Sequence, residues 1–197
     1  MESRSDRTWP LPRQPWVMRM TWSELLFTHW AIESFGLVRA LFFDKPPDRT
    51  WNLTWHKDTS VAVKDNSIRS ASFSRPTTKA AVPHLIAADE VLHQMLTLRI
   101  HLDEVTDDNG PLEVIPGSHV SSDSDGVGVA GAVTIHARVG DVLAMRPLVS
   151  HASGSSAEGT RRHRRILHLE FAASPVLPDG MQWHDFVAAE PAHARED

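Results

Sequence analysis

The chain of 197 residues contains no cysteine. This absence excludes disulfide scaffolds, thiolate zinc fingers, iron–sulfur clusters and cysteine nucleophiles. The sequence also has no apolar run near the ~20 residues that a membrane-spanning helix needs, and its polar start is unlike a secretory signal peptide. We therefore expect a soluble, cytoplasmic protein in which any metal site uses histidine, aspartate or glutamate side chains.

An excess of positive charge is absent too. The chain has 20 Lys and Arg against 25 Asp and Glu, a formal net charge of −5, which disfavours a dedicated nucleic-acid binder. Phosphate-binding glycine loops, Gly-x-Ser-x-Gly and His-Glu-x-x-His do not occur in it. The composition, with 41% hydrophobic and 23% charged residues, is that of a globular protein. We expect a small-molecule partner, and the sequence leaves the oligomeric state open.

Alternating polarity indicates several short strands. From Thr97 to Asp103, polar side chains (including Arg99 and His101) alternate with leucine and isoleucine, so the two kinds lie on opposite faces of a strand. Residues 165–171 alternate in the same way. Each of these segments is therefore predicted to be a strand with one polar face.

Turn-forming residues separate the predicted strands. Asn109-Gly110 predicts a tight hairpin turn, with residues 112–115 as the partner of the preceding strand. Residues 64–87 are rich in serine and proline, and we interpret them as an irregular lid or binding loop. A helix is expected to begin in a capping box at Thr21.

Short strands, frequent turns and few helices favour a mainly β protein, an antiparallel sandwich or barrel. We divide the chain into an atypical N-terminal arm and helix over residues 1–36, a β domain over residues 37–185 and a polar tail over residues 186–197. The length fits one such domain with an appended arm.

The segment Trp55-His56-Lys57-Asp58 carries candidate metal ligands. Side chains two apart on a strand point to the same face, so His56 and Asp58 can hold one ion together. His151, just after a predicted strand, is the best candidate for a third ligand. Two histidines and one carboxylate leave three positions of an octahedral ion open, as in non-heme Fe(II) oxygenases. A chelating cosubstrate needs two of these positions and O₂ needs one.

The His-x-Asp pattern has an alternative interpretation, a surface pair on an edge strand, because such a triplet arises easily in a chain with 12 histidines. A second triplet, His101-Leu102-Asp103, lies on the polar face of its strand, which could point into a barrel. We interpret this second triplet as structural, and His119 as a turn-stabilising residue.

Three segments, in this order, resemble the phytanoyl-CoA dioxygenase family: residues 51–58 (WNLTWHKD), 96–119 (LTLRIHLDEVTDDNGPLEVIPGSH) and 140–171 (GDVLAMRPLVSHASG…RRILHLEF). The resemblance implies Fe(II)- and 2-oxoglutarate-dependent oxygenases on a double-stranded β-helix, which is a jelly-roll barrel. The fold class expected for this chain is therefore a jelly-roll barrel with a helical N-terminal piece.

The resemblance also implies roles for single residues. The catalytic Fe(II) would be bound by the three residues identified above, His56, Asp58 and His151. Arg164 matches the arginine that binds the far carboxylate of 2-oxoglutarate, for which its planar fork of N–H groups is suited. Ser153 and Thr97 match hydroxyl positions that assist the same carboxylate.

The choice of arginine has an alternative in Arg162, which is also at a familiar separation from His151. The phase of the predicted strand favours Arg164, because it shares a face with His168 and Glu170. The other basic residues of this cluster, together with Lys45 and Lys57, allow an anionic substrate, and solvated surface charge explains them equally well.

The resemblance implies a dioxygenase that hydroxylates an aliphatic C–H of an unidentified small molecule, using O₂. Asp58 favours hydroxylation, because related halogenases lack this carboxylate and bind chloride in its place. Two rivals stay open: a cupin-like metalloenzyme with other chemistry, and a non-catalytic or truncated jelly-roll binding module. The N-terminus departs from the family, since residues 14–31 instead resemble the opening of an unrelated, uncharacterised bacterial family.

Overall fold

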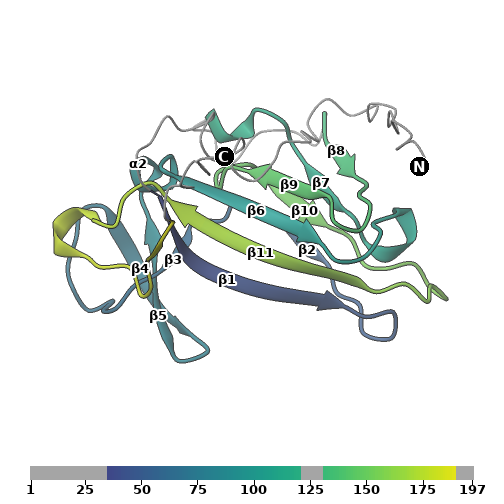
Figure 1. Ribbon diagram of the computed structural model, residues 1–197, viewed down its shortest axis with the longest axis horizontal. Coiled ribbons are helices and arrows are strands. Elements are labelled where there is room, and N and C mark those ends of the chain that lie inside the picture. Colours follow the sequence, from purple (N-terminus) through teal and green to yellow (C-terminus); the bar gives the residue numbers. More distant parts are fainter. Residues whose placement is uncertain (1–34, 121–130, 190–197) are drawn as a thin grey trace, which may run out of the picture.

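The computed structural model describes residues 35–120 and 131–189. These residues form three antiparallel sheets (Figure 1). The largest sheet contains, in spatial order, β12 (Val187–Ala188), β1 (Gly36–Lys45), β11 (Arg164–Ala172), β6 (Met95–His101) and β9 (Val142–Met145). The expected helix at Thr21 lies outside the described residues, as do most of the predicted N-terminal arm and polar tail.

The second sheet supplies the opposite layer of the barrel. It contains β2 (Leu53–His56), β10 (His151–Ser153), β7 (Leu112–Val114) and β8 (Val133–Ile135). The third sheet contains β3 (Ser60–Ala62), β5 (Val82–Ala87) and β4 (Phe73–Lys79). The helical elements are short: α2 (Asp89–Leu92), η1 (Asp107–Asn109), η2 (Ser118–Val120) and η3 (Pro178–Gly180). The prediction of a mainly β jelly-roll is confirmed.

Alternation along β11 has the predicted phase. Arg164, Ile166, His168 and Glu170 are buried, whereas Arg165 between them is exposed. The apolar face of β6 is buried as well, since Leu96 and Leu98 pack in a cluster with Phe35 and Phe171. Because the apolar face is covered on the outside, the polar face of β6 is the one that points into the barrel.

A β-bulge in β1 determines which of its side chains face inward. The register with β11 shifts between Leu37 and Arg39. An extra residue reverses the alternation of a strand relative to its partner. Beyond the bulge, Arg39 lies opposite Glu170 and Lys45 lies opposite Arg164. Opposed residues of antiparallel strands share a face, so both cationic side chains point into the barrel.

Two regions differ from the sequence predictions. Residues 64–87 are not irregular, because they contain β4 and β5, which pair with each other. The Asn109-Gly110 turn exists, but it does not join a hairpin: β6 lies in the largest sheet, whereas β7 pairs with β8 and β10 in the second. The chain crosses between layers at this turn instead of doubling back. The largest sheet also continues past residue 185, since β12 pairs with β1.

Apolar clusters close the barrel on two sides of its polar interior. A large cluster joins the third sheet to the segment after β11, and includes Val61, Val63, Phe73, Leu85 and Trp183. A smaller cluster joins β7, β8 and β9, and consists of Leu112, Val114, Ile135, Leu143 and Met145. No helix in the described residues is long and apolar enough to cross a membrane.

Candidate active site

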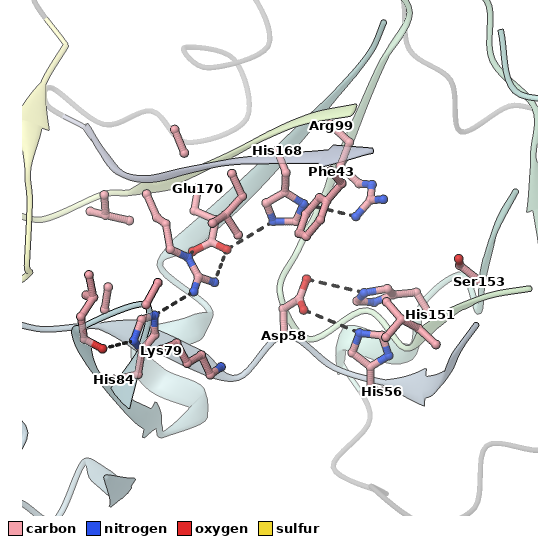
Figure 2. Close-up of a pocket in the computed structure, with 18 of the residues that line it drawn as sticks. Phe43, His56, Asp58, Lys79, His84, Arg99, His151, Ser153, His168 and Glu170 are labelled. Atoms are coloured by element: carbon pink, nitrogen blue, oxygen red, sulfur yellow. Dashed lines mark hydrogen bonds and ion pairs between the residues drawn. The ribbon is translucent and has the colours of Figure 1, made fainter. Parts of the chain in front are cut away.

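Three of the predicted site residues come together at one end of the second sheet. His56 ends β2 and lies directly opposite His151 on β10. Asp58 follows the end of β2, where its backbone N–H donates to the Pro147 carbonyl at 2.9 Å. One ligand atom from each of the three residues lies within 4.8 Å of the other two, and Figure 2 shows both rings directed at the carboxylate.

Hydrogen bonds fix the tautomer of both imidazoles. Nδ1–H of His56 donates to the Thr54 carbonyl at 2.7 Å, and Nδ1–H of His151 donates to the Val149 carbonyl at 2.9 Å. The Nε2 atoms are therefore the free ligand atoms, and they lie 3.9 Å and 3.6 Å from the two Asp58 oxygens. Backbone carbonyls of this kind orient metal-binding histidines.

Electrostatics at His151 favour a neutral ligand. Burial lowers the pKa of His151, and this effect outweighs the nearby Asp58 carboxylate, which raises it. A neutral imidazole is the form that binds a metal ion. Two imidazole nitrogens and one carboxylate oxygen match the donor set of a non-heme iron centre, so the residues present fit the metal that the sequence predicts.

The second His-x-Asp triplet does not form a comparable group. Asp103 accepts three hydrogen bonds from Arg165, including two from the guanidinium at 2.8 Å and 2.6 Å. His101 is buried on the inner face, and burial lowers its pKa to about 4. In the described part of the chain, the only group of three such side chains is the one formed by His56, Asp58 and His151.

Arg164 and Ser153 also meet inside the barrel. An Arg164 Nη donates to Ser153 Oγ at 3.2 Å, and the side chain is only 5% exposed. Its Nε has no hydrogen-bond partner among the described residues. Burial, and then the charge of Arg99, lower the pKa of Arg164 to about 10. Arg162, the alternative, is half exposed and pairs with Glu104 at 2.8 Å, so of the two arginines Arg164 is the one that lies inside the barrel on the cavity wall.

Lys45 joins this group, although no sequence pattern predicted that it lies in the site. The Lys45 ammonium is fully buried and donates to Ser153 Oγ at 2.9 Å and to the Gly154 carbonyl at 2.6 Å. Burial, and then the Arg164 charge, lower its pKa to about 8. Gly110 permits this packing, because its φ is +66° and a Cβ there would lie 2.5 Å from the Gly154 oxygen.

Thr97 lies elsewhere on the inner face. It is directly opposite Glu170 on β11, six residues from Arg164, which corresponds to about 20 Å along a strand. The structure therefore does not bring Thr97 to the Arg164–Ser153 group.

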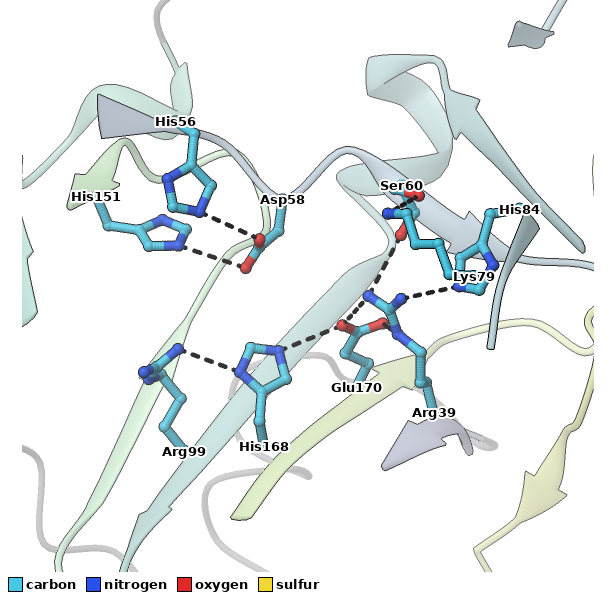
Figure 3. A network of polar contacts seen from close by, with 10 residues as sticks. All are labelled: Arg39, His56, Asp58, Ser60, Lys79, His84, Arg99, His151, His168 and Glu170. Carbon is cyan, nitrogen blue, oxygen red and sulfur yellow. Dashed lines mark hydrogen bonds and ion pairs between the residues drawn. The ribbon is translucent and has the colours of Figure 1, made fainter. Parts of the chain in front are cut away.

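A chain of buried polar groups runs across the inner face beside the candidate metal ligands (Figure 3). Arg39 donates to both Glu170 oxygens, at 2.8 Å and 2.5 Å. His168 donates from Nε2 to Glu170 at 3.2 Å and accepts at Nδ1 from Arg99 at 3.2 Å. Burial raises the pKa of Glu170, but the His168 and Arg39 hydrogen bonds outweigh it and the net shift is downward. The alternation of residues 97–103 predicted that Arg99 lies on the polar face of its strand, but no sequence pattern predicted a role for it.

The candidate metal ligands, Arg164, Ser153 and the chain of buried polar groups line one cavity of about 710 Å³, whereas Lys45 and Thr97 are not on its wall. Strands from all three sheets line it. The polar side chains on its wall are Arg39, His56, Asp58, Lys79, His84, Arg99, His151, Ser153, Arg164, His168, Glu170, His184 and Asp185. The candidate metal ligands and the candidate anion-binding group therefore open into the same space.

The sequence model of the phytanoyl-CoA dioxygenase family matches residues 19–163. The chain belongs to this family. The match begins within the segment 14–31 that sequence analysis set apart, so the family extends further toward the N-terminus than the sequence resemblance indicated. The comparison with curated proteins found no match.

Solved structures share the family fold at low sequence identity. AviO1 from Streptomyces viridochromogenes Tue57 is 23% identical, with a TM-score of 0.50 over 74% of this chain and 54% of that one. SnoN, a non-heme alpha-ketoglutarate-dependent epimerase from nogalamycin biosynthesis, is 19% identical, with a TM-score of 0.51 over 76% of this chain and 50% of that one. The chain thus spans about half the length of the structures it matches.

Proposed function

We propose that the chain is an Fe(II)- and 2-oxoglutarate-dependent oxygenase that hydroxylates an aliphatic C–H bond of a small molecule. The observation that carries this proposal is the convergence of His56, Asp58 and His151 within 4.8 Å in a cavity that also holds the buried Arg164. Metal ligands and an arginine for a dicarboxylate are both needed for this chemistry. A cupin-like metalloenzyme with other chemistry would not require the arginine.

Different residues would bind the metal and the cosubstrate. His56, Asp58 and His151 would hold Fe(II) on one face. Arg164 would bind the far carboxylate of 2-oxoglutarate, whose charge offsets the cost of burying the guanidinium. Ser153 Oγ, which already accepts from Arg164 and Lys45, holds the two cations together.

The bound iron, with O₂ and 2-oxoglutarate, would supply the oxidising power. In this reaction one atom of O₂ would end in succinate, released together with CO₂, and the other would end in the hydroxyl group of the product. The protein's part is to orient both reactants in a cavity enclosed by apolar clusters. Asp58 occupies the position that halogenases leave to chloride, which favours hydroxylation as the outcome.

The decisive experiment separates metal binding from cosubstrate binding. The full chain would be loaded with Fe(II) without oxygen, and 2-oxoglutarate affinity measured by calorimetry for wild type, Arg164→Gln and the control Arg162→Gln. We expect Arg164→Gln to lose about 100-fold in 2-oxoglutarate affinity, because it removes two hydrogen bonds to a charged group, while Fe(II) affinity and the control stay unchanged.

Turnover tests the reaction itself. With O₂ admitted, wild type should convert 2-oxoglutarate to succinate, slowly without a substrate and faster with one, and a hydroxylated product should gain one oxygen atom in mass. Equal 2-oxoglutarate affinity in wild type and Arg164→Gln would contradict the assignment. Tight metal binding without succinate would favour a different metalloenzyme, and absence of both would favour a binding module.

A further inference from the structure

The β4–β5 hairpin of the third sheet forms one wall of the cavity. Lys79, Ala80, Val82 and His84 of this hairpin line the same space as the candidate metal ligands. Lys79 lies opposite Val82 in the register of the two strands, and opposed residues share a face of a sheet. The hairpin therefore presents a cationic side chain, Lys79, on the face that closes the cavity.

A β-bulge in β4 turns Lys79 to this face. The pairing with β5 shifts between Ser74 and Thr77, which adds one residue to β4 and reverses the alternation of its later side chains. Arg75, inside the bulge, has a φ of +51°. Without the extra residue, Thr78 would face the cavity and Lys79 would point away from it. Bulges beside functional sites redirect side chains in this way.

The turn that follows Lys79 has a strained backbone. Ala80 and Ala81 have φ values of +47° and +65°, in the left-handed region that is unfavourable for a residue with a Cβ. Glycine, asparagine or aspartate usually occupies the two central positions of such a hairpin turn. Because strained residues concentrate at ligand-binding and active sites, the bulge and the turn together indicate that the position of Lys79 has a function.

The Lys79 ammonium is held in place but is not neutralised. Its Nζ donates to Ser60 Oγ at 2.9 Å, and an ammonium has two further N–H donors. The carboxylates of the same wall already have partners: Glu170 pairs with Arg39, and Asp185 pairs with His184. In the part of the chain that the structure describes, Lys79 is therefore the cation of this wall that forms no ion pair.

Electrostatics separate Lys79 from the proposed cosubstrate group. Its charge lowers the pKa of His84, an effect that is smaller than that of burial. Burial also lowers the pKa values of Lys45 and Arg164, but the charges that add to this effect are those of arginines, and Lys79 is not among them. The field of Lys79 thus acts on its own hairpin and not on the group that would bind 2-oxoglutarate.

Distances along the strands give the same separation. Glu170 lies six residues from Arg164, or about 20 Å along β11. Its partner Arg39 donates to the Ser60 carbonyl at 3.3 Å, and Ser60 is the residue that holds Lys79. The two ends of the cavity therefore carry different cations, with Arg164 at one end and Lys79 at the other.

Lys79 is nevertheless within reach of a molecule bound beside the metal. Its partner Ser60 follows Asp58 by two residues, or about 7 Å along an extended chain. In Figure 3, Asp58 lies between Lys79 and the two candidate metal-binding histidines. A small molecule can therefore contact the ammonium while another of its atoms lies near the metal.

We propose that Lys79 binds an anionic group of the substrate, a carboxylate or a phosphate, at the end of the cavity away from Arg164. This inference rests on the proposed function for the reaction, and it adds the chemical class of the substrate and a residue that selects it. A compact ammonium binds either anion as a point charge. The substrate would extend from Lys79 past Asp58, so that a C–H bond several bonds from the charge reacts.

The test compares anions with neutral analogues of similar shape. Hexanoate and 3-phenylpropanoate, each against its primary amide, and hexyl phosphate against hexanol would be titrated by calorimetry into the full chain loaded with Fe(II) and 2-oxoglutarate without oxygen. In wild type we expect the carboxylate pairs, the phosphate pair or both to favour the anion by at least about fivefold, because a charge pair forms at a partly exposed site. The pair with the larger ratio identifies the anion.

Three single variants make the test specific to one side chain. In Lys79→Gln the ratio of anion to analogue affinity should fall to within about twofold of unity. Lys79→Arg keeps the charge and should retain part of the preference. Lys64→Gln removes an exposed lysine that is not on the wall of this cavity, and it should leave the ratio unchanged. None of the three should change the affinity for 2-oxoglutarate.

A double variant tests the role of the bulge. Thr78→Lys combined with Lys79→Thr keeps the net charge and moves the ammonium by one residue to the other face of β4. Both positions are exposed, so the exchange should leave the fold intact. We expect the double variant to lose the preference for the anion as completely as Lys79→Gln does.

Several results would overturn the inference. Anions that bind no better than their analogues, or do not bind wild type at millimolar concentrations, would show that Lys79 is only a solvated surface charge. A preference that survives Lys79→Gln or the exchange would place the anion elsewhere. A loss of 2-oxoglutarate affinity in Lys79→Gln as large as in Arg164→Gln would assign Lys79 to the cosubstrate. Failure of wild type to bind 2-oxoglutarate with Fe(II) would instead refute the proposed function, and the same titrations without cosubstrate would still decide whether Lys79 binds an anion.

Discussion

The burial of Arg164 predicts that this side chain lowers the stability of the ligand-free protein, although it is needed to bind 2-oxoglutarate. Without a ligand, the guanidinium is 5% exposed and pairs with no carboxylate of the described residues. A pKa lowered from the ordinary arginine value to about 10 corresponds to roughly 3 kcal/mol against the charged form. Since the group is still protonated at pH 7, this whole cost opposes folding there. Replacing Arg164 by an apolar side chain of similar length should therefore stabilise the free protein.

Arg164→Met is the change that tests this reasoning. The variant loses the hydrogen bond to Ser153, worth about 1 kcal/mol, but Ser153 Oγ keeps Lys45 as a donor. We expect a net gain of about 2 kcal/mol in the free energy of unfolding at pH 7. For a chain of this length, that gain raises Tm by about 4–8 °C.

Bound 2-oxoglutarate should make wild type more stable than Arg164→Met, which is the reverse of the order expected without ligands. A ligand at 100 times its Kd stabilises a protein by about 2.7 kcal/mol, so adding 2-oxoglutarate to the metal-loaded protein should stabilise wild type strongly and Arg164→Met hardly at all. Urea unfolding of the metal-free chain and thermal unfolding with both ligands measure the two effects. Arg162→Met, an exposed control, should stay within about 0.5 kcal/mol of wild type. If Arg164→Met proves less stable than wild type without ligands, the buried charge is not reserved for a ligand and the reasoning fails.

Three further predictions concern other parts of the site. Asp58→Ala should lower Fe(II) affinity at least about 100-fold without unfolding the chain, because it removes a partly exposed carboxylate donor; unchanged metal content after dialysis would contradict this. Lys45 has its pKa lowered to about 8, so between pH 8 and 9 the unfolded chain binds more protons than the folded one. The free energy of unfolding should therefore rise by about 1 kcal/mol over that interval, and Lys45→Met should lack this rise in urea titrations. Asn109→Ala should cost about 3 kcal/mol in chemical denaturation, because its buried side chain bonds the backbone of Thr106, Glu104 and His163; a loss below 1 kcal/mol would show that water replaces these bonds.

Regular alternation is the part of the site that the sequence predicts well. β11 runs without a bulge against β6, so its period of two places Arg164 on the same face as His168 and Glu170. That phase was enough to prefer Arg164 over Arg162. The residue types of His56, Asp58 and His151 also predicted a shared metal. The pairing of β2 with β10, which brings His56 opposite His151, is a long-range contact that no local sequence pattern predicts.

The bulge in β1 explains why Lys45 was not assigned to the site. Between Leu37 and Arg39 the strand gains one residue, which moves every later side chain to the opposite face. The apolar segment before Lys45 has no alternation from which this phase could be read. Lys45 becomes part of the interior only because a β-bulge, which has no simple sequence signal here, turns it toward Arg164.

Arg99 was placed on the correct face for an incomplete reason. Alternation separates two faces of a strand but does not say which one meets water. For β6 the apolar face is covered by Phe35 and Phe171 on the outside, so the polar face must point inward. A polar face inside a barrel requires either paired charges or a ligand, and Arg99 has no paired carboxylate among the described residues.

The two His-x-Asp triplets show how tertiary partners decide a function that local sequence leaves open. His56 meets His151 across β2 and β10, whereas Asp103 is bound by Arg165. The buried cations, which are exceptions to ordinary burial rules, lie in the same part of the protein as the metal ligands. Cations are almost never fully buried unless paired, yet Lys45, Arg99 and Arg164 all lie in the interior beside one cavity. Because residues that violate folding rules concentrate at functional sites, this clustering supports a ligand-binding interior independently of the family match.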